Sequence, residues 1–464
     1  MTDTYPVRSC QSSATKPPNF RLVHSRARRK PCIALPRSYS QLTSGTRETN
    51  PPTDDSRHLL PLPTFARTWT QVSSKVPPKT NRPLPKKMSS EKAPVPIDLG
   101  KVIVVGGNGF LGHHVVNQLL AGDRWQTSSV SVIDLRCANN RNPAASYHEA
   151  DITDTEKIKS IFEDVKPDVV IHTASPAPQA DGPVAKDLFR CVNIDGTASI
   201  IAASQAAGVK ALVYTSSASI ISDNTSDLIN ADERWPVIRG EQQSEYYSET
   251  KAAAEELVLQ ANRQDPYPLL TAAIRPAGIF GEGDTMATHQ LVKIYREGKT
   301  GVQLGDNDNL FDFTYVGNVA HAHMLAARML LATIKSSIIP LDNEKIDGEA
   351  FLVTNDSPIY FWDFARAIWR AAGSDKGTDH VWKIPREIGV VLGFCSEVFF
   401  SIIGKPPIFN RQRNIYSCMT RYYNISKAKR LLGYRPIVSL DSGIKRGVQW
   451  FLDQEKAGKV SVKA

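Results

Sequence analysis

Cysteine is scarce in this sequence, and no two cysteines have the spacing of a structural site. The six cysteines are scattered along 464 residues, and none forms a C-x-x-C pair. Neither a zinc site nor a disulfide framework is therefore expected, and a reducing compartment fits this usage. The sequence also lacks an apolar run as long as the roughly 20 residues that cross a bilayer. No segment has the apolar core of a secretory signal, so a secretory signal peptide is not expected.

An excess of positive charge is missing from most of the chain. The formal net charge is +9, but residues 1–99 carry +11 and residues 100–464 carry −2. The larger part therefore lacks the basic footprint of a nucleic-acid-binding protein, and no nucleic acid is expected as a partner.

Residues 1–95 are rich in Pro, Ser, Thr and Arg and have no helical or strand period. We expect them to form a disordered basic leader. Arg26–Lys30 (RARRK) suits a nuclear or transit signal, and the Arg and Ser content mildly suits a mitochondrial presequence, although prolines interrupt an amphipathic helix. A third interpretation, which we favour, is that the working protein starts at Met88.

A glycine-rich turn organises the rest of the chain. Lys101–Val105 is predicted to be a buried parallel strand, and a helix is predicted to run to about Leu120. Between them, Gly106 permits a sharp exit from the strand, Gly109 lets backbone approach a pyrophosphate, and Gly112 lets the helix lie close to the sheet. The helix N-terminus then offers N–H groups to the phosphates. A tight turn without a ligand is the alternative, and the following strands argue against it.

Acidic and small residues end the next predicted strands. Ser129–Leu135 contains Asp134, roughly 20 residues after the last glycine, where a carboxylate binds ribose hydroxyls and favours NAD over NADP. Arg136 could partly reverse that preference, so NADP stays an alternative. Asp151 follows a short strand at the expected place of the adenine, and Thr153 or Asp154 can cap a helix over 155–165.

Tyr247 and Lys251 are the candidate catalytic pair. They are spaced i and i+4 and so share one helix face. They follow the strand Lys210–Ser217, which ends in hydroxyl residues. Such a pair can be surface decoration, but its place in a dinucleotide-binding fold favours catalysis. Asn193, inside a helix predicted over 184–207, is either a surface residue or a brace behind the active site.

The chemistry of alcohol oxidation explains these residue types. Free tyrosine has a pKa of about 10 and is a poor base at neutral pH. A nearby ammonium favours the phenolate, so Lys251 can lower the pKa of Tyr247 and also hold the nicotinamide ribose. Ser217, or Ser216, can orient the substrate oxygen toward Tyr247, while the cofactor accepts the hydride.

Several motifs together resemble one superfamily. They are GGNGFLG, VVIHTASP, N-x-x-GT, VYTSSAS, YSETK, IRPAGIFG, FDFTYVGNVAHAH and RYYNISKAKRLLGYRP. They look like the extended short-chain dehydrogenase/reductases and, over about residues 100–455, their 3β-hydroxysteroid dehydrogenase branch. Within that branch, the HTASP strand end and the YTSSAS/YYSETK pair look most like the decarboxylating sterol-4α-carboxylate 3-dehydrogenases.

This resemblance implies a function and site roles. The family oxidises the 3β-hydroxyl of a 4α-carboxysterol with NAD, and the resulting β-keto acid loses CO₂ without a metal. Tyr247 would be the proton acceptor, Lys251 the ribose-binding residue that tunes Tyr247, and Ser217 the residue that positions the hydroxyl. The residues expected to hold the cofactor are Gly106, Gly109, Phe110, Leu111, Gly112, Asp134, Asp151, Ile152, Ala174, Tyr247, Lys251 and Pro276.

Residues 388–403 form the longest apolar stretch, with Glu397 as its one charge. They are either a buried helix or a monotopic segment that dips into one leaflet. Trp382 upstream, with Lys405 and Arg411–Arg413 downstream, suits an interface. The resemblance implies an endoplasmic reticulum membrane location on the cytosolic face, or a lipid droplet, and other sterol C4-demethylation enzymes as partners. A homodimer that pairs through the Tyr247 helix is a further expectation.

The sequence therefore predicts an α/β protein with a doubly wound parallel sheet, an extended NAD-binding Rossmann fold. We expect the Rossmann core over residues 100–285 and a smaller substrate-binding, membrane-associating part, interleaved with the core, over 286–455. A 3β-hydroxysteroid dehydrogenase without decarboxylation and a nucleotide-sugar epimerase or dehydratase remain alternatives. An NAD-binding redox regulator would not need the intact Tyr247 and Lys251, and a scaffold role is compatible with catalysis.

Overall fold

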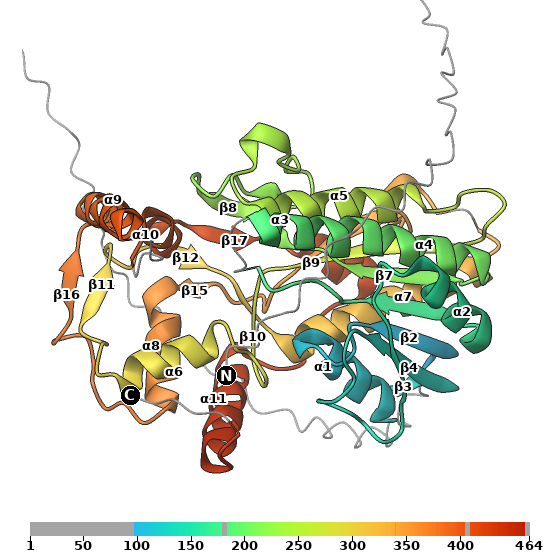
Figure 1. The fold of residues 1–464 in the computed structure, drawn as a ribbon, viewed down its shortest axis with the longest axis horizontal. Helices are drawn as coiled ribbons and strands as arrows, with labels where there is room; N and C mark the ends of the chain where they lie inside the picture. Colours follow the sequence, from blue (N-terminus) through green and yellow to red (C-terminus); the bar gives the residue numbers. More distant parts are fainter. Residues whose placement is uncertain (1–96, 179–182, 339, 404–408, 460–464) are drawn as a thin grey trace, which may run out of the picture. The chain divides into compact units, whose positions relative to one another are not determined.

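The computed structural model describes residues 97–178, 183–338, 340–403 and 409–459. The leader over residues 1–95, with its predicted disorder, lies outside these residues. The described part is built around one seven-stranded parallel sheet that has helices on both faces (Figure 1).

The strand order of this sheet creates a site for a dinucleotide. The order is β14-β9-β7-β6-β2-β4-β5. These strands are β14 (Glu349–Val353), β9 (Leu270–Pro276), β7 (Ala211–Thr215), β6 (Val169–His172), β2 (Lys101–Val105), β4 (Ser129–Asp134) and β5 (Ser146–Glu149). The chain runs outward from β2 to β5 and then returns to the other side of β2 with β6. Ligands of open α/β sheets bind at the carboxyl ends of the strands beside such a reversal. The predicted fold class is confirmed.

Alternating side chains of β2 explain why both faces are covered. Val102 and Val104 belong to the apolar core under one helical layer, whereas Ile103 and Val105 belong to the core under the other. The first layer contains α1 (Phe110–Leu120) and α7 (Val316–Lys335). The second contains α2 (Thr155–Val165), α4 (Thr197–Ala206) and α5 (Tyr246–Gln260). A parallel strand that is buried on both faces needs apolar residues at every position.

The helix predicted at 155–165 is confirmed, and Asp154 Oδ1 caps it by accepting the Lys157 N–H at 3.1 Å. The helix predicted over 184–207 is interrupted. It consists of α3 (Pro183–Phe189), a π-helical turn over Arg190–Gly196, and α4. Asn193 lies in this π-helical turn, a form that often marks functional sites.

The C-terminal part adds β14 to the main sheet and α7 to the helices that cover it, and smaller sheets combine strands from several parts of the chain. A four-stranded sheet has the order β15-β12-β17-β8. Its strands are β15 (Ile359–Tyr360), β12 (Leu310–Phe311), β17 (Arg421–Tyr423) and β8 (Leu228–Ala231). The two-stranded pairs are β10 (Gly278–Phe280) with β13 (Phe313–Tyr315), β11 (Val302–Leu304) with β16 (Trp382–Ile384), and β1 (Ile97–Asp98) with β3 (Trp125–Gln126). The remaining helices are α6 (Thr288–Arg296), α8 (Phe361–Ala371), α9 (Arg386–Ile402), α10 (Arg411–Cys418) and α11 (Leu440–Lys456).

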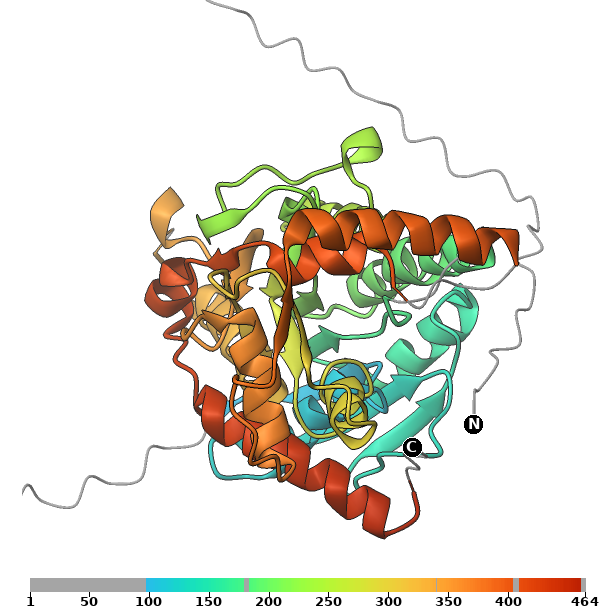
Figure 2. The ribbon, with the colours of Figure 1, turned by 90° about the vertical axis from the view of Figure 1, so that its left-hand side faces the viewer.

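The interpretation of residues 388–403 as a buried helix is wrong. These residues form most of α9, which lies against α10 (Figures 1 and 2) and buries only Gly389 and Gly393. A side chain at either glycine would collide with α10 or with the residue before it. The helix α9 therefore contacts α10 through the face that carries these two glycines. Most of its large apolar side chains are exposed.

Candidate active site

The glycine turn between β2 and α1 is as tight as its sequence predicts. Gly106 has a φ of +81°, which favours glycine. A Cβ at Gly106 would lie 2.6 Å from the backbone nitrogen of Ala174, and one at Gly112 would lie 2.1 Å from the Gly106 carbonyl oxygen. Gly109 precedes α1 without a side-chain cap. The turn therefore presents bare backbone at the N-terminus of α1, which suits a pyrophosphate.

The ends of β4 and β6 lie beside this turn. The Asp134 carboxylate accepts the Asn108 N–H at 2.9 Å, and burial raises its pKa, against the effect of backbone N–H groups. The other predicted cofactor residues at the strand ends are Asp151, Ile152 and Pro276. Asp151 Oδ1 accepts the Thr153 N–H at 2.9 Å, and Ile152 is buried against Gly196. Pro276 is the last residue of β9.

These residues fit a dinucleotide. The turn is free of side chains where phosphates would bind, a carboxylate stands at the end of the second strand, and small residues end the central strand. Asn108 Oδ1 is buried and has no hydrogen-bond partner among the described residues. The site therefore contains an unsatisfied acceptor within the phosphate-binding turn, which a ligand or a bound water can satisfy.

Tyr247 and Lys251 share α5, as their spacing predicts, but no hydrogen bond joins the two side chains in the described structure. The Lys251 Nζ donates a hydrogen bond to the Thr215 carbonyl oxygen at 2.5 Å and lies 4.5 Å from the Tyr214 ring centroid. Burial lowers the pKa of Lys251 to about 7. Burial also raises the pKa of Tyr247 to about 12, against a hydrogen bond with Ser175. The lowering of the Tyr247 pKa by Lys251 thus stays a prediction.

Ser217 begins a line of hydroxyl groups that leads to α5. Its Oγ lies 2.8 Å from Ser219 Oγ, which accepts a hydrogen bond from Ser248 at 2.8 Å. Ser248 is the neighbour of Tyr247 along the chain. Ser216 Oγ is instead buried without a partner in the described part of the chain. Of the two candidate serines, Ser217 is therefore the one whose hydroxyl is connected to the helix that carries Tyr247.

Asn193 braces α5, as one of the two interpretations predicts. Its Nδ2 donates to Thr250 Oγ1 at 3.0 Å, and its side chain is buried. Phe189, on α3, packs edge-on against the Tyr247 ring, with centroids 5.7 Å apart. The segment from α3 to α4 thus holds both the tyrosine and the helix that presents it.

Two supporting contacts were missed by sequence reasoning. His323 Nε2 lies 2.7 Å from the hydroxyl oxygen of Thr215, the residue whose carbonyl oxygen accepts from Lys251. Glu255 forms a bidentate pair with the buried Arg275, at 2.9 and 2.5 Å. Glu255 also lies one turn after Lys251, and its charge favours the protonated form of that lysine by raising its pKa, against the effect of burial. The i, i+4 spacing was a usable signal for this second relation, whereas nothing in the sequence pairs Glu255 with Arg275. Nothing in the sequence places His323 beside Thr215.

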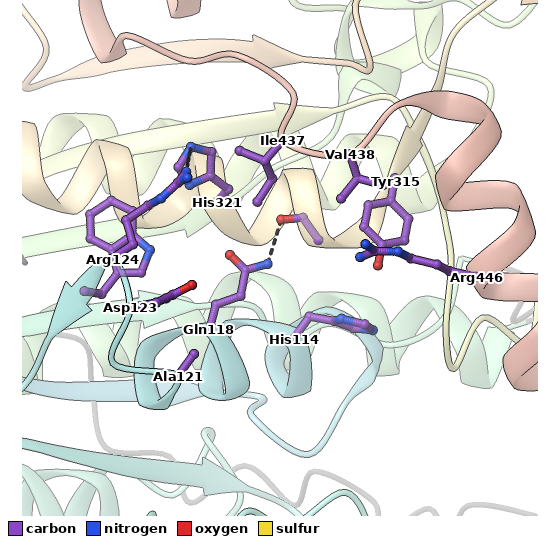
Figure 3. A pocket seen from close by; sticks show the side chains of 12 residues that line it. His114, Gln118, Ala121, Asp123, Arg124, Tyr315, His321, Ile437, Val438 and Arg446 are labelled. Carbon is purple, nitrogen blue, oxygen red and sulfur yellow. Dashed lines mark hydrogen bonds between the residues drawn. The ribbon is translucent and has the colours of Figure 1, made fainter. Parts of the chain in front are cut away.

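A cavity of about 310 Å³ lies elsewhere, between α1, α7 and α11 (Figure 3). The Gln118 side chain lies near the middle of the cavity, and its Nε2 donates to the Gly317 carbonyl oxygen at 2.8 Å. Arg124 and His321 line one end, and Tyr315 and Arg446 line the other. None of its lining residues is a predicted site residue, so we do not assign the reaction to it.

The helix α9 exposes many large apolar side chains. Its exposed side chains are Ile388, Val391, Leu392, Phe394, Val398, Phe399 and Ile402, followed by Ile403. Steps of three and four residues place them on one face. The only charge within the stretch, Glu397, is paired with Arg411 of α10 at 2.8 Å. Among the described residues, no helix is both long and apolar enough to cross a membrane.

Comparisons with known proteins give consistent results. Residues 103–386 match the model of the 3-beta hydroxysteroid dehydrogenase/isomerase family. The chain is 41% identical to a Schizosaccharomyces pombe sterol-4-alpha-carboxylate 3-dehydrogenase, decarboxylating, over 76% of this chain and 98% of the relative. Identity to the mouse protein of the same name is 36%, over 76% of this chain and 91% of the relative.

Solved structures show the same fold at lower identity. The Thermotoga maritima UDP-glucose 4-epimerase aligns with a TM-score of 0.56 and 22% identity, covering 76% of this chain and 99% of that one. The Thermus thermophilus UDP-glucose 4-epimerase, solved with NAD, has a TM-score of 0.53 at 22% identity, covering 76% and 99%. At this identity the likeness concerns the fold.

Proposed function

Because the chain belongs to the 3-beta hydroxysteroid dehydrogenase/isomerase family, we propose that it is an NAD(P)-dependent 3-dehydrogenase that oxidises and decarboxylates a 4α-carboxysterol. The observation that carries this proposal is the joint presence of the Tyr247, Lys251 and Ser217 cluster with relatives named for that reaction. The bound nicotinamide supplies the hydride acceptor.

The residues divide the oxidation between them. Tyr247 takes the proton of the 3β-hydroxyl, and Ser217 holds the substrate oxygen by a hydrogen bond. Lys251 binds the nicotinamide ribose and supplies positive charge when protonated. Its lowered pKa, about 7, means that a small gain in favourable contacts changes its charge state near neutral pH. The Asn193 and Phe189 contacts keep α5 and Tyr247 in place.

Loss of CO₂ then needs little more from the protein. The oxidised substrate is a β-keto acid, in which the electrons of the breaking C4–carboxylate bond move into the C3 carbonyl and form an enolate. Hydrogen bonds from Tyr247 and Ser217 to this oxygen stabilise the developing charge. A proton added at C4 completes the 3-ketosterol. No further oxidant is required.

We also propose that α9 lies in the cytosolic leaflet of the endoplasmic reticulum or on a lipid droplet. Its exposed apolar face has the form of a monotopic segment. Trp382 is largely exposed just before the helix, and the exposed Lys383 and Arg386 suit anionic headgroups. A membrane location would also bring the enzyme to its sterol and to other sterol C4-demethylation enzymes. The homodimer stays a prediction.

Turnover with a set of substrates tests the proposed function. Purified protein should form NADH with a 4α-carboxy-3β-hydroxysterol, and mass spectrometry should detect the ketone without the carboxylate. The Tyr247→Phe variant should lose at least a factor of about 10³ in kcat while still binding NAD, since it keeps the fold but removes the proton acceptor. Equal turnover of a sterol without the carboxylate would favour a plain 3β-hydroxysteroid dehydrogenase. Turnover of a UDP-sugar alone would contradict the proposal.

A further inference from the structure

Arg421 is a buried arginine without a carboxylate partner. It opens β17, pairs in register with Phe311 of β12, and is 6% exposed. Its Nε donates to the Tyr423 hydroxyl at 2.7 Å, and its guanidinium carbon lies 5.7 Å from the Tyr416 ring centroid. Within the described ranges, no Asp or Glu forms an ion pair with it. The tyrosines give the guanidinium polar and aromatic neighbours but leave most of its donors unused.

Such an arrangement is unusual for a buried charge, which is normally paired. The same protein shows the normal case, because Arg275 is equally buried and is bound by both oxygens of Glu255. A guanidinium presents a planar set of donors that matches a carboxylate in a bidentate geometry. Arg421 therefore has the chemistry of a site for a carboxylate that the protein itself does not supply.

Glu245 relates Arg421 to the catalytic residues. It precedes α5, and its Oε2 accepts a hydrogen bond from Ser248 at 3.4 Å. Burial raises the pKa of Tyr247, and the negative charge of Glu245 acts in the same direction. Burial opposes the charged form of Arg421, but Tyr423, Tyr416 and Glu245 together raise its pKa above the usual value. Hydrogen bonds connect this point to the strand of Arg421. Gln243 Oε1 accepts from the Glu245 N–H at 3.2 Å and from Asn224 Nδ2 at 3.3 Å. Asn224 precedes β8, in which Leu228 pairs with Arg421 of β17, so the start of α5 and Arg421 are joined through the loop before β8.

The chemistry of the substrate requires this proximity. The carboxylate of a 4α-carboxysterol is attached to C4, next to the carbon that carries the 3β-hydroxyl. A group that binds the carboxylate must therefore lie in the same pocket as the group that takes the hydroxyl proton. We propose that Arg421 binds the 4α-carboxylate and selects carboxylated sterols. This inference rests on the proposed function.

The position of the charge also limits what Arg421 does. During CO₂ loss, negative charge leaves the carboxylate and moves to the C3 oxygen beside Tyr247 and Ser217. An ion pair with Arg421 stabilises the carboxylate before this step and so does not accelerate it. Arg421 is thus a specificity-determining residue, and its removal should raise KM for the acid more than it lowers kcat.

Kinetics of Arg421 variants test the inference. Arg421→Met should lower kcat/KM for the 4α-carboxysterol by about 100-fold, mainly through KM, and should change that for the same sterol without the carboxylate by less than about threefold. Arg421→Lys keeps the charge but not the planar pair of donors. Its kcat/KM for the 4α-carboxysterol should therefore lie between the values of wild type and Arg421→Met. Arg435→Met, which changes an exposed arginine of the same segment, is the matched control and should behave like wild type. Thermal unfolding and NAD binding check that each variant is folded.

A binding measurement makes the test independent of turnover. A 4α-carboxysterol without the 3-hydroxyl is compared with its methyl ester by competition against the substrate or by direct titration. Wild type should prefer the acid, and Arg421→Met should bind both equally. Equal losses on acid and ester, or an unchanged preference in folded Arg421→Met, would overturn the role of Arg421. If wild type prefers the acid but oxidises no carboxysterol, the proposed function fails while the carboxylate site stands.

Discussion

Two buried arginines of the described chain, Arg275 and Arg421, lie on different sheets and differ in how their charge is balanced. Arg275 lies on β9 of the main sheet and is neutralised by Glu255 of α5. Arg421 lies on β17 of the small sheet and is surrounded by tyrosines, with no carboxylate bound to it in the described residues. The main sheet thus neutralises its buried arginine with a carboxylate of the protein, whereas the small sheet holds an arginine without one.

The surface of the molecule shows a similar contrast. Helices cover both faces of the main sheet, and its apolar residues are buried. Outside the main sheet, α9 instead exposes an apolar face. A protein that binds a sterol acid needs both a cation for the acid and an apolar surface, and the part of the chain after the main sheet supplies both.

Stability measurements on the two arginines should give the largest difference. Arg275→Met leaves the Glu255 carboxylate buried without a partner, and we expect a loss of about 3–5 kcal/mol in unfolding free energy. Arg421→Met leaves no paired carboxylate behind and removes only the hydrogen bond to the Tyr423 hydroxyl, so stability should fall by only about 1 kcal/mol. Chemical denaturation measures both values, and Arg275→Met combined with Glu255→Leu should recover most of the loss. Equal losses for the two single variants would contradict the comparison.

The phosphate-binding turn gives the next largest effect. In Gly112→Ala the new Cβ would lie 2.1 Å from the Gly106 carbonyl oxygen, so the turn must shift. We expect a loss of about 1–3 kcal/mol in stability and weaker NAD binding, measured by denaturation and by titration. Gly377→Ala is the control, because nothing lies within 4 Å of its added Cβ. Unchanged NAD affinity in Gly112→Ala would show that the turn does not take part in binding the cofactor.

Lys251, on a helix that covers the main sheet, has a charged form that burial disfavours. We expect the protein to keep this unfavourable group because catalysis needs it. Its pKa, about 7 in the folded protein, lies below the unfolded value of about 10.4, so the folded state binds fewer protons between these values. Stability should therefore rise with pH across this window. The pKa difference corresponds to about 4 kcal/mol at pH 7, and the lost hydrogen bond to Thr215 offsets part of it, so Lys251→Met should be inactive but more stable than wild type by about 2 kcal/mol. This gain should vanish as the pH approaches 10.5, and a gain independent of pH would contradict the assignment.

Substitutions on α9 should have the smallest effect on stability. Phe399→Asp and Ile402→Asp change side chains that are 59% and 79% exposed, so unfolding free energy should change by less than about 0.5 kcal/mol. The fraction of protein that sediments with phosphatidylcholine–phosphatidylserine vesicles should nevertheless fall strongly. Leu341→Asp, at a similarly exposed leucine outside α9, is the matched control. Undiminished vesicle binding by the α9 variants would exclude α9 as the membrane contact.

The sequence allowed prediction of those parts of the site that depend on local pattern. The turn from Gly106 to Gly112 and the spacing of Tyr247 and Lys251 are local, because a few neighbouring residues decide their conformation. The direction of the Lys251 side chain is different, since Thr215 and Tyr214, which receive it, are on another element. The exposure of α9 could not be predicted either, because an apolar run fits a buried helix and an interfacial one equally well.

Arg421 shows the same limit most clearly. Its neighbours Tyr416 and Tyr423 are close in sequence, but Glu245, at the start of α5, is far from it in the sequence and is connected to β17 only through the loop before β8. A sequence pattern does not indicate whether an arginine is buried or paired. Both properties follow from the tertiary arrangement, and they are what distinguish this residue from other arginines of the chain.

The central claim is that one active site couples oxidation at C3 to loss of the C4 carboxylate. The most direct measurement uses a 4α-carboxysterol labelled with ¹³C in the carboxylate and follows NADH and ¹³CO₂ together. The account predicts one ¹³CO₂ for each NADH, with both lost in Tyr247→Phe. NADH formed without ¹³CO₂, the carboxylate remaining on the ketone, would contradict it.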